Sequence, residues 1–384
     1  MNKITAIKNA QLVLENGIIW DGVLLIEDGR IKAFGSHRDV VIPDGAERID
    51  AGGAYVGPGF VDIHVHACAA GYQTKDNPIE AYDFFLGHGT TSMLITPEYR
   101  LTQEEYMKVF EIAKDAIGKN NGIKGIYMEG PFINTKYGAN ADLNPWHGGI
   151  PKEVLKAIVD GAGDMAKVWT IAPERDDIMD FVTYAREVNP KCVFAVGHSE
   201  TTPAQVRALG SDFRPRLMTH YGCATGRIPT YGGTRGYGPD EYCLSDNEMY
   251  AELISDSLGI HVHPDNQKML LKCKGFERVV LITDCTYADS PTPANLSHVT
   301  DINFDANGGI YGSKLTMDVA CRNIMTHTSC SIAQAFVMAS LNPARVIGLD
   351  DKVGSIEVGK LADLVFVDDR FNVKRVMVAG KVCI

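Results

Sequence analysis

The residues of this 384-residue chain that could do chemistry are polar side chains that follow short apolar runs. Imidazoles and carboxylates of this kind suit Zn(II), Fe(II), Mn(II), Co(II) or Ni(II). A site built from them leaves coordination positions open, as catalytic metal sites do. We expect one or two divalent ions per subunit, with zinc the leading choice. The expected ligands are four histidines and a glutamate, namely His64, His66, Glu129, His198 and His220.

The spacing of these residues suggests how two ions could be held. The first two histidines are two residues apart, which places both rings on one face of a strand, where they could bind one ion. His198 and His220 could bind a second, and Glu129 could bridge the two. A bound metal lowers the pKa of water from 15.7 to about 7. Asp284 is then the expected general base and, afterwards, the acid toward a leaving amine. Taken singly, each histidine could instead be structural, and Asp284 a helix N-cap.

The elements that must position these residues are eight apolar runs, most of them separated by helical patterns such as 102–118 and 151–163. Nearly continuous apolar runs of this kind predict parallel strands buried on both faces. Eight of them favour a (β/α)8 barrel over residues 56–349, in which residues at strand C-termini converge on one active site. A further helical region is expected at 317–348. The runs are 59–66, 91–97, 123–131, 167–174, 192–199, 216–222, 250–256 and 278–284.

Both ends of the chain differ from the middle because their apolar and polar residues alternate with a period of two, which is typical of strands. Asn16-Gly17 and Asp28-Gly29 are hairpin dipeptides between such strands. We expect one small β-sandwich domain built from residues 1–55 and 350–384, so that the fold class is α/β with a composite second domain. The alternative is two independent terminal hairpins.

Composition excludes several classes of protein. A formal net charge of −11 argues against a broad nucleic-acid or anionic-membrane surface, although a few local cations could still bind an anionic substrate. Nine cysteines without a CxxC pair are typical of reduced thiols, and no apolar run approaches 18 residues. We expect a cytoplasmic enzyme with no membrane partner. The long Gly/Tyr-rich span 223–249 is expected to be functional or disordered, and Asp246, Glu248 and Glu252 to form an exposed helix face.

At this point the sequence resembles the amidohydrolase superfamily and, within it, the N-acetylglucosamine-6-phosphate deacetylases. The first and last of the shared segments occur across the superfamily, whereas MEGP and GSKLTMD narrow the resemblance to the deacetylases. The segments are PGFVDIHVH (58–66), MEGPFIN (128–134), GHSETT (197–202), MTHYGCAT (218–225), HVHP (261–264), LITDC (281–285), GSKLTMD (312–318) and LNPARVIGLDDKVGSIEVGKLADLVFVD (341–368).

The resemblance implies a role for each matching residue. Glu129, His198 and His220 match the family's metal set, the HxH pair that only some members keep is intact, and Asp284 matches the catalytic aspartate. It also implies a homodimer, because the phosphate-binding arginine would come from the partner subunit. The implied substrate contacts are His261, Cys223, Ala224, Ile310, Tyr311, Asn140, Arg235 and Arg227.

Three segments depart from the family pattern, and all of them belong to substrate-contacting loops. KYGAN puts Asn140 where the family usually has a histidine that polarises the acetyl carbonyl, a role His147 could take over. HYGCAT lacks the usual asparagine. In GGTRGYGPDE the best match to the phosphate-binding arginine is Arg235, with Arg227 second, although either could be a solvated loop cation.

The leading hypothesis is therefore hydrolysis of N-acetylglucosamine 6-phosphate to glucosamine 6-phosphate and acetate. An alternative keeps the barrel and metals but changes the substrate to N-acetylgalactosamine 6-phosphate, an unphosphorylated amino sugar or another amide. A non-catalytic sugar-binding protein is the third reading, and the complete ligand set argues against it.

Overall fold

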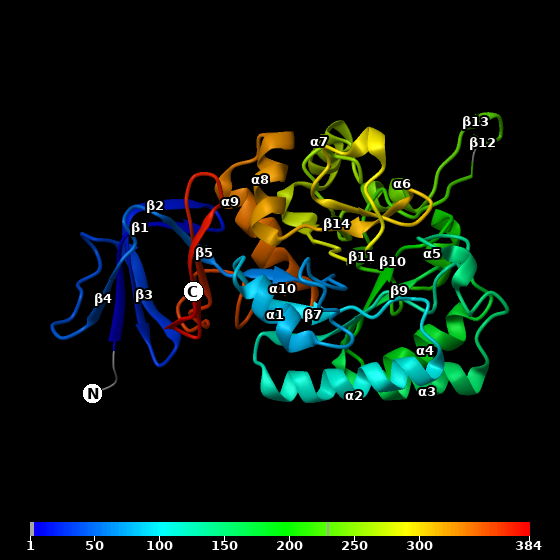
Figure 1. Ribbon diagram of the computed structural model, residues 1–384, viewed down its shortest axis with the longest axis horizontal. Helices are drawn as coiled ribbons and strands as arrows, with labels where there is room; N and C mark the ends of the chain where they lie inside the picture. The colour runs from blue at the N-terminus through cyan, green and yellow to red at the C-terminus, as the bar shows by residue number, and fades with distance from the viewer. Residues whose placement is uncertain (1–3, 229) are drawn as a thin grey trace.

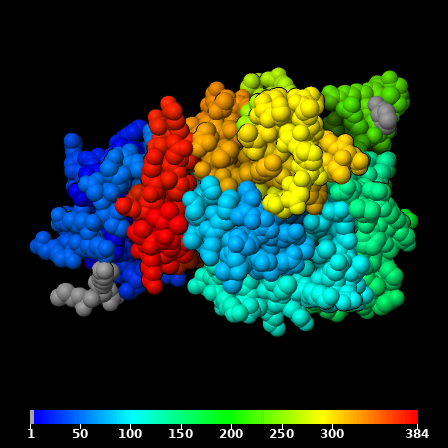
Figure 2. Space-filling view, in the orientation of Figure 1, coloured from blue at the N-terminus to red at the C-terminus, as the bar shows by residue number. Residues whose placement is uncertain are grey.

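The computed structural model describes residues 4–228 and 230–384. Figure 1 shows a sheet that combines both ends of the chain beside a larger body of alternating strands and helices. In the space-filling view of Figure 2, the C-terminal segment lies between the N-terminal strands and this larger body. No helix in the described part of the chain has the length and apolar character needed to cross a membrane.

The eight apolar runs form one parallel sheet whose strand order follows the chain. Beyond the ends of its first and last strands, the backbone N–H of Asp284 donates to the carbonyl oxygen of His64 at 2.9 Å. This contact brings the two edges together and confirms the predicted (β/α)8 barrel. The strands are β6 (Phe60–Asp62), β7 (Thr90–Ile95), β8 (Ile123–Met128), β9 (Ala166–Ile171), β10 (Val193–Val196), β11 (Leu217–Met218), β14 (Tyr250–Leu253) and β15 (Val279–Leu281).

Burial on both faces explains why these strands are apolar throughout. All six residues of β7 are buried. Side chains such as Val61, Leu94 and Val168 fill the barrel interior, while Met93 and Trp169 pack outward against the helices. A strand covered on both sides cannot alternate apolar and polar residues without burying unpaired polar groups.

Helices cover the outside of the barrel. Thr102 caps the N-terminus of α2 and forms a capping box with Glu105. The helix buries Tyr106, Phe110 and Ala113 along one face. The expected helices 102–118 and 151–163 correspond to α2 and α3. The helices are α1 (Pro78–Leu86), α2 (Gln103–Lys119), α3 (Lys152–Ala162), α4 (Ile178–Val188), α5 (Pro203–Ala208), α6 (Pro239–Ser245), α7 (Pro264–Lys274), α8 (Met317–Thr328), α9 (Ile332–Phe336) and α10 (Asn342–Val346), with 3₁₀ segments at Ala141–Leu143, Gly163–Met165, Phe276–Arg278 and Ala294–Leu296 and a π-helical turn at Val337–Leu341.

The terminal strands form a single eight-stranded sheet rather than two separate hairpins. β5 pairs in parallel with β1 and antiparallel with β18, so the N-terminal and C-terminal strands share one ladder. The small β domain is thus built from both termini, as expected. Its strands are β1 (Ile4–Leu14), β2 (Gly17–Glu27), β3 (Arg30–Ser36), β4 (Glu47–Asp50), β5 (Tyr55–Pro58), β18 (Leu364–Val367), β19 (Val373–Val378) and β20 (Lys381–Val382).

Two short hairpins lie on the same side of the barrel as the strand C-termini. The long 223–249 span contains the hairpin β12 (Thr230–Tyr231) and β13 (Thr234–Arg235), followed by α6. In Figure 1 this hairpin projects away from the body of the molecule. The second hairpin, β16 (Ile302–Phe304) and β17 (Ile310–Ser313), leads into α8.

Candidate functional site

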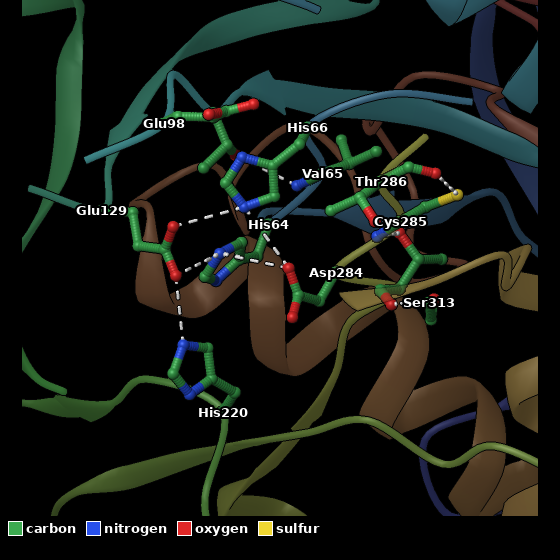
Figure 3. Close-up of polar contacts among 12 residues, drawn as sticks. His64, Val65, His66, Glu98, Glu129, His220, Asp284, Cys285, Thr286 and Ser313 are labelled. Atoms are coloured by element: carbon green, nitrogen blue, oxygen red, sulfur yellow. Dashed lines mark hydrogen bonds and ion pairs between the residues drawn. The ribbon is translucent and has the colours of Figure 1, made fainter. Parts of the chain in front are cut away.

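The predicted metal ligands converge at the C-terminal ends of the barrel strands. The histidine pair follows β6, Glu129 follows β8, His198 and His220 follow β10 and β11, and Asp284 follows β15. Figure 3 shows Glu129 beside His64, with dashed contacts from its carboxylate to His64, His66 and His220. Side chains from sequence positions up to 220 residues apart therefore share one site, as the barrel topology requires.

Two clusters of side chains each bring their donor atoms within 4.8 Å of one another, and the clusters share Glu129. One cluster is His64, His66 and Glu129, and the other is Glu129, His198 and His220. One oxygen of Glu129, Oε1, is 2.9 Å from Nε2 of His198 and 3.1 Å from Nε2 of His220. The other, Oε2, is 3.3 Å from Nε2 of His66. Oε1 is also 3.6 Å from Nε2 of His64, so the Glu129 carboxylate lies within reach of the ligand candidates of both clusters.

The donor set fits a divalent transition metal. Nε2 of His64 is buried and has no hydrogen-bond partner among the described residues. The Nε2 atoms of His198 and His220 are only 3.1 Å apart, so they cannot both carry a proton pointed at the other. Buried imidazole nitrogens that converge on one carboxylate, with the Nε2 of His64 left without a hydrogen-bond partner, are typical of metal ligands.

Three of the four ligand histidines are oriented through their other nitrogen, whereas Nδ1 of His66 is buried without a hydrogen-bond partner among the described residues. Nδ1 of His198 and Nδ1 of His220 lie 3.2 Å from the carbonyl oxygens of Tyr137 and Cys223, respectively. Nδ1 of His64 lies 3.1 Å from a carboxylate oxygen of Glu252. Because these oxygens accept hydrogen bonds, the Nδ1 atoms carry the protons and the Nε2 lone pairs face the site.

Glu252 corrects one expectation from the sequence. It lies in strand β14 and is completely buried, and Asp246 is buried as well. The prediction that Asp246, Glu248 and Glu252 form an exposed helix face is therefore wrong. An isolated acidic residue in an apolar run could have signalled this buried carboxylate.

Charge at the site is governed by the buried histidines. Burial alone would raise the pKa of Asp284, but a hydrogen bond from His66 and the charges of the histidine pair lower it below its usual value. Glu129 is likewise buried, yet the attraction of His198 and His66 holds its pKa well below the ordinary value. Both carboxyl groups are therefore ionised and able to accept a cation or a proton.

A cavity of about 570 Å³ opens in front of these residues. It is lined by the metal-ligand candidates apart from His64, by Asp284, and by six of the expected substrate contacts: Asn140, Cys223, Ala224, His261, Ile310 and Tyr311. His261 is held by Asp256, whose carboxylate lies 3.2 Å from its Nδ1. Its Nε2 is buried without a hydrogen-bond partner in the described chain, so it remains free to contact a ligand.

The two expected phosphate contacts lie elsewhere. Arg235 is on the projecting hairpin, its side chain is 80% exposed, and it pairs with Glu241. Arg227 is also exposed, and neither arginine is among the residues that line the cavity. His147 is exposed and its Nε2 lies 3.0 Å from the carbonyl oxygen of Ala141.

Sequence reasoning missed the hydrogen-bonded Glu98 and Arg100 on the cavity wall, next to Tyr311. Arg100 donates to Glu98 at 2.8 Å and to the Tyr311 hydroxyl at 3.2 Å, and the Tyr311 hydroxyl donates to Glu98 at 3.1 Å. Glu98 and Arg100 directly follow the second apolar run. Their place at a strand C-terminus was the signal that could have found them.

Comparisons with known proteins agree with this geometry. Residues 252–383 match the model of the amidohydrolase family. The chain is 28% identical to the N-acetylglucosamine-6-phosphate deacetylase of Bacillus subtilis, with 98% of this chain and 96% of that protein covered. It is 35% identical to a putative N-acetylgalactosamine-6-phosphate deacetylase of Escherichia coli over 145 residues, 36% of this chain and 85% of that protein.

A solved structure extends the similarity to the whole fold. It is a mutant of the N-acetyl-D-glucosamine-6-phosphate deacetylase of Mycobacterium smegmatis, in complex with N-acetyl-D-glucosamine-6-phosphate. The TM-score is 0.82 at 26% identity, and 99% of each chain is covered.

Proposed function

This chain belongs to the amidohydrolase family, and from that premise we propose that it removes the acetyl group from N-acetylglucosamine 6-phosphate. The observation that carries the proposal is the cavity in which Asp284 faces two overlapping clusters of metal-ligating side chains. Similarity to deacetylases along 98% of the chain supports the reaction type.

The proposed ligands are the four histidines and Glu129, and a divalent ion bound there supplies a Lewis acid for the amide carbonyl and lowers the pKa of water. We propose zinc as the metal, with one or two ions per subunit. Iron, manganese, cobalt or nickel would suit the same nitrogen and oxygen donors. The bridging position of Glu129 supports two ions.

Asp284 moves the proton in the proposed reaction. Its carboxylate is ionised and lies 3.3 Å from Nε2 of His66 at the cavity wall. It accepts a proton from the attacking water and then passes it to the departing nitrogen. The carbon–oxygen bond forms first and the carbon–nitrogen bond breaks afterwards, once the nitrogen has received the proton, so one water yields acetate and the free amine.

The remaining cavity residues would bind and orient the sugar. Asn140 would donate a hydrogen bond to the acetyl carbonyl. His261 would use its free Nε2 on the sugar phosphate. Backbone and side-chain groups of Cys223, Ala224, Ile310 and Tyr311 would complete the contacts.

We propose a homodimer in which Arg235 reaches the phosphate in the neighbouring subunit's cavity. Its place on a projecting hairpin, with an 80% exposed side chain, supports this arrangement. Arg227 is the second choice for the same role.

The proposed domain division is residues 1–55 with 350–384 for the small β domain and 56–349 for the barrel. A cytoplasmic location is also proposed, since the cysteines of the described chain are all free thiols.

N-acetylgalactosamine 6-phosphate is the second candidate substrate, because the Escherichia coli relative is a putative deacetylase of that sugar. A panel containing both phosphosugars, their unphosphorylated forms and N-acyl amino acids would be assayed with zinc-loaded protein. We expect the highest kcat/KM with N-acetylglucosamine 6-phosphate. A higher value with any other amide would reassign the substrate.

A further inference from the structure

Glu252 has no part in the proton transfers described above, yet it lies behind the metal-ligand candidates. The carboxylate is completely buried in the barrel, at the third position of β14. A buried carboxylate is costly unless strong hydrogen bonds compensate for its lost hydration. Its Oε2 accepts hydrogen bonds from the ring Nδ1 of His64 at 3.1 Å and from the backbone N–H of His220 at 3.0 Å.

These two contacts reach one member of each ligand cluster. His64 belongs to the cluster with His66, and His220 to the cluster with His198; the clusters overlap only at Glu129. Glu252 therefore joins the two clusters from behind, while Glu129 joins them from the cavity side.

The contact to His64 determines which of its nitrogens can bind a metal. A carboxylate oxygen can only accept, so it holds the proton on Nδ1 and leaves the Nε2 lone pair toward Glu129, whose Oε1 is 3.6 Å away. The ring of Tyr127, 4.4 Å from that of His64 between centroids, limits reorientation. A carboxylate behind a ligand histidine also makes that histidine a more basic ligand.

The contact to His220 acts on the backbone. His220 has a φ of 29°, in a region that residues other than glycine rarely adopt. The hydrogen bond from its N–H to Glu252 helps to hold this conformation, which directs the ring at Glu129. In the second cluster, carbonyl oxygens hold the Nδ1 atoms of His198 and His220, whereas among the described residues the Nδ1 of His64 has Glu252 as its one hydrogen-bond partner.

We propose that Glu252 is a positioning residue that makes the site binuclear: by orienting His64, it gives the His64, His66 and Glu129 cluster its affinity for a second ion. This proposal rests on the metal-dependent function proposed above. Loss of Glu252 leaves one ion at His198 and His220 and weakens binding of the other, by roughly 10–100-fold for loss of such an outer partner.

The test is zinc titration of metal-stripped full-length protein, with stoichiometry from elemental analysis and affinities from competition with a chromophoric chelator. Wild type is expected to bind two zinc ions and Glu252→Gln to bind one tightly and the second roughly 10–100-fold more weakly. Asp62→Asn is the matched control. Asp62 is also a buried carboxyl group beside His64, but it accepts hydrogen bonds from the backbone N–H of His64 and from the Thr283 hydroxyl and not from the His64 ring. The Asp62→Asn variant is expected to keep both ions.

A double-variant cycle shows whether Glu252 acts through His64. Adding Glu252→Gln to His64→Asn is expected to weaken the second ion no further than His64→Asn does alone. If Glu252→Gln does not fold, Glu252→Asp takes its place, since it keeps the charge but withdraws the carboxylate by one methylene.

Two ions bound with unchanged affinities in the Glu252 variants, or a single ion in wild type, would overturn the proposal. Additive effects in the cycle would do so as well. Failure of the proposed function looks different: wild type would bind two zinc ions and release no acetate.

Discussion

Several residues at the centre of the site have backbone conformations that side chains other than glycine rarely adopt. His198, His220 and Asp284 have φ angles of 45°, 29° and 45°. Each lies two or three residues beyond the end of a barrel strand, where the chain must turn sharply while its side chain points into the site. Conformations of this kind cost about 1–3 kcal/mol each and persist where surrounding contacts fix them, which is common at functional sites.

Asp284 gives the sharpest prediction at the residue scale. Asp284→Asn keeps the size of the side chain but removes the group that takes up the proton from water. We expect kcat to fall by at least ~10², while zinc stoichiometry and the circular dichroism spectrum stay as in wild type. Steady-state kinetics and elemental analysis on one preparation would check both. An undiminished kcat would show that Asp284 is not the proton carrier.

The pKa of His66 predicts how metal-free protein responds to pH. Burial lowers this pKa, but the charge of Glu129 and a hydrogen bond to Asp284 outweigh it and raise the value from 6.5 to about 9. Protonated His66 therefore stabilises the metal-free fold fully below pH 6.5, and this contribution is lost as pH rises through 9.

We expect the free energy of unfolding of metal-free protein to decline between pH 7 and 10, and less steeply in His66→Asn. Urea unfolding at a series of pH values measures this difference. Parallel pH profiles for the two proteins would contradict the assignment.

At the scale of elements, the strands follow from sequence because a parallel strand buried on both faces has to be a short apolar run. Their C-terminal ends then located the metal-ligand candidates and Asp284. The contact between Glu252 and His64 could not be predicted, because the two residues are 188 positions apart and no local pattern reports such a contact. The exposed position of Arg235 depends on the path of a long loop, which hydrophobic periodicity does not fix.

Gly57 lies where the small β domain joins the barrel, and its lack of a side chain allows the Phe336 ring to approach the backbone of β5 closely. A Cβ at this position of β5 would lie less than 3.0 Å from three atoms of the Phe336 ring. Phe336 is buried and packs between Phe60 and Phe371. Gly57→Ala should therefore lower the free energy of unfolding by about 1–3 kcal/mol.

Gly118 serves as the control, since a Cβ there meets no atom within 4 Å among the described residues and the position lies in α2. Gly118→Ala should raise stability by about 0.5–1 kcal/mol. Both variants would be measured by chemical denaturation, and equal stabilities would refute the proposed packing constraint.

At the scale of the molecule, a net charge of −11 coexists with a proposed anionic substrate. Among the described residues that line the cavity, the one arginine is Arg100, which is already paired with Glu98. A phosphate would therefore need a cation from elsewhere, and the projecting hairpin carries Arg235. This is the physical reason for proposing that the site is completed by a second subunit.

Mixing two inactive variants tests that arrangement. Arg235→Gln and Asp284→Asn subunits would be mixed, dissociated and reassociated. A mixed dimer has one complete site, with Asp284 from one subunit and Arg235 from the other, so about a quarter of wild-type activity should return for random pairing. Light scattering would establish the dimer. No recovery from a mixture that does form dimers would place the phosphate contact within one subunit.

The most direct test of metal-dependent deacetylation is the balance of products from N-acetylglucosamine 6-phosphate. Acetate and glucosamine 6-phosphate would both be quantified for three samples of the protein: zinc-loaded, stripped of zinc by a chelator, and reloaded with zinc. We predict equimolar release of both products, loss of release on chelation and recovery with zinc. Undiminished release of the two products by zinc-free protein, or no release by protein carrying its full zinc complement, would contradict the proposal of metal-dependent deacetylation.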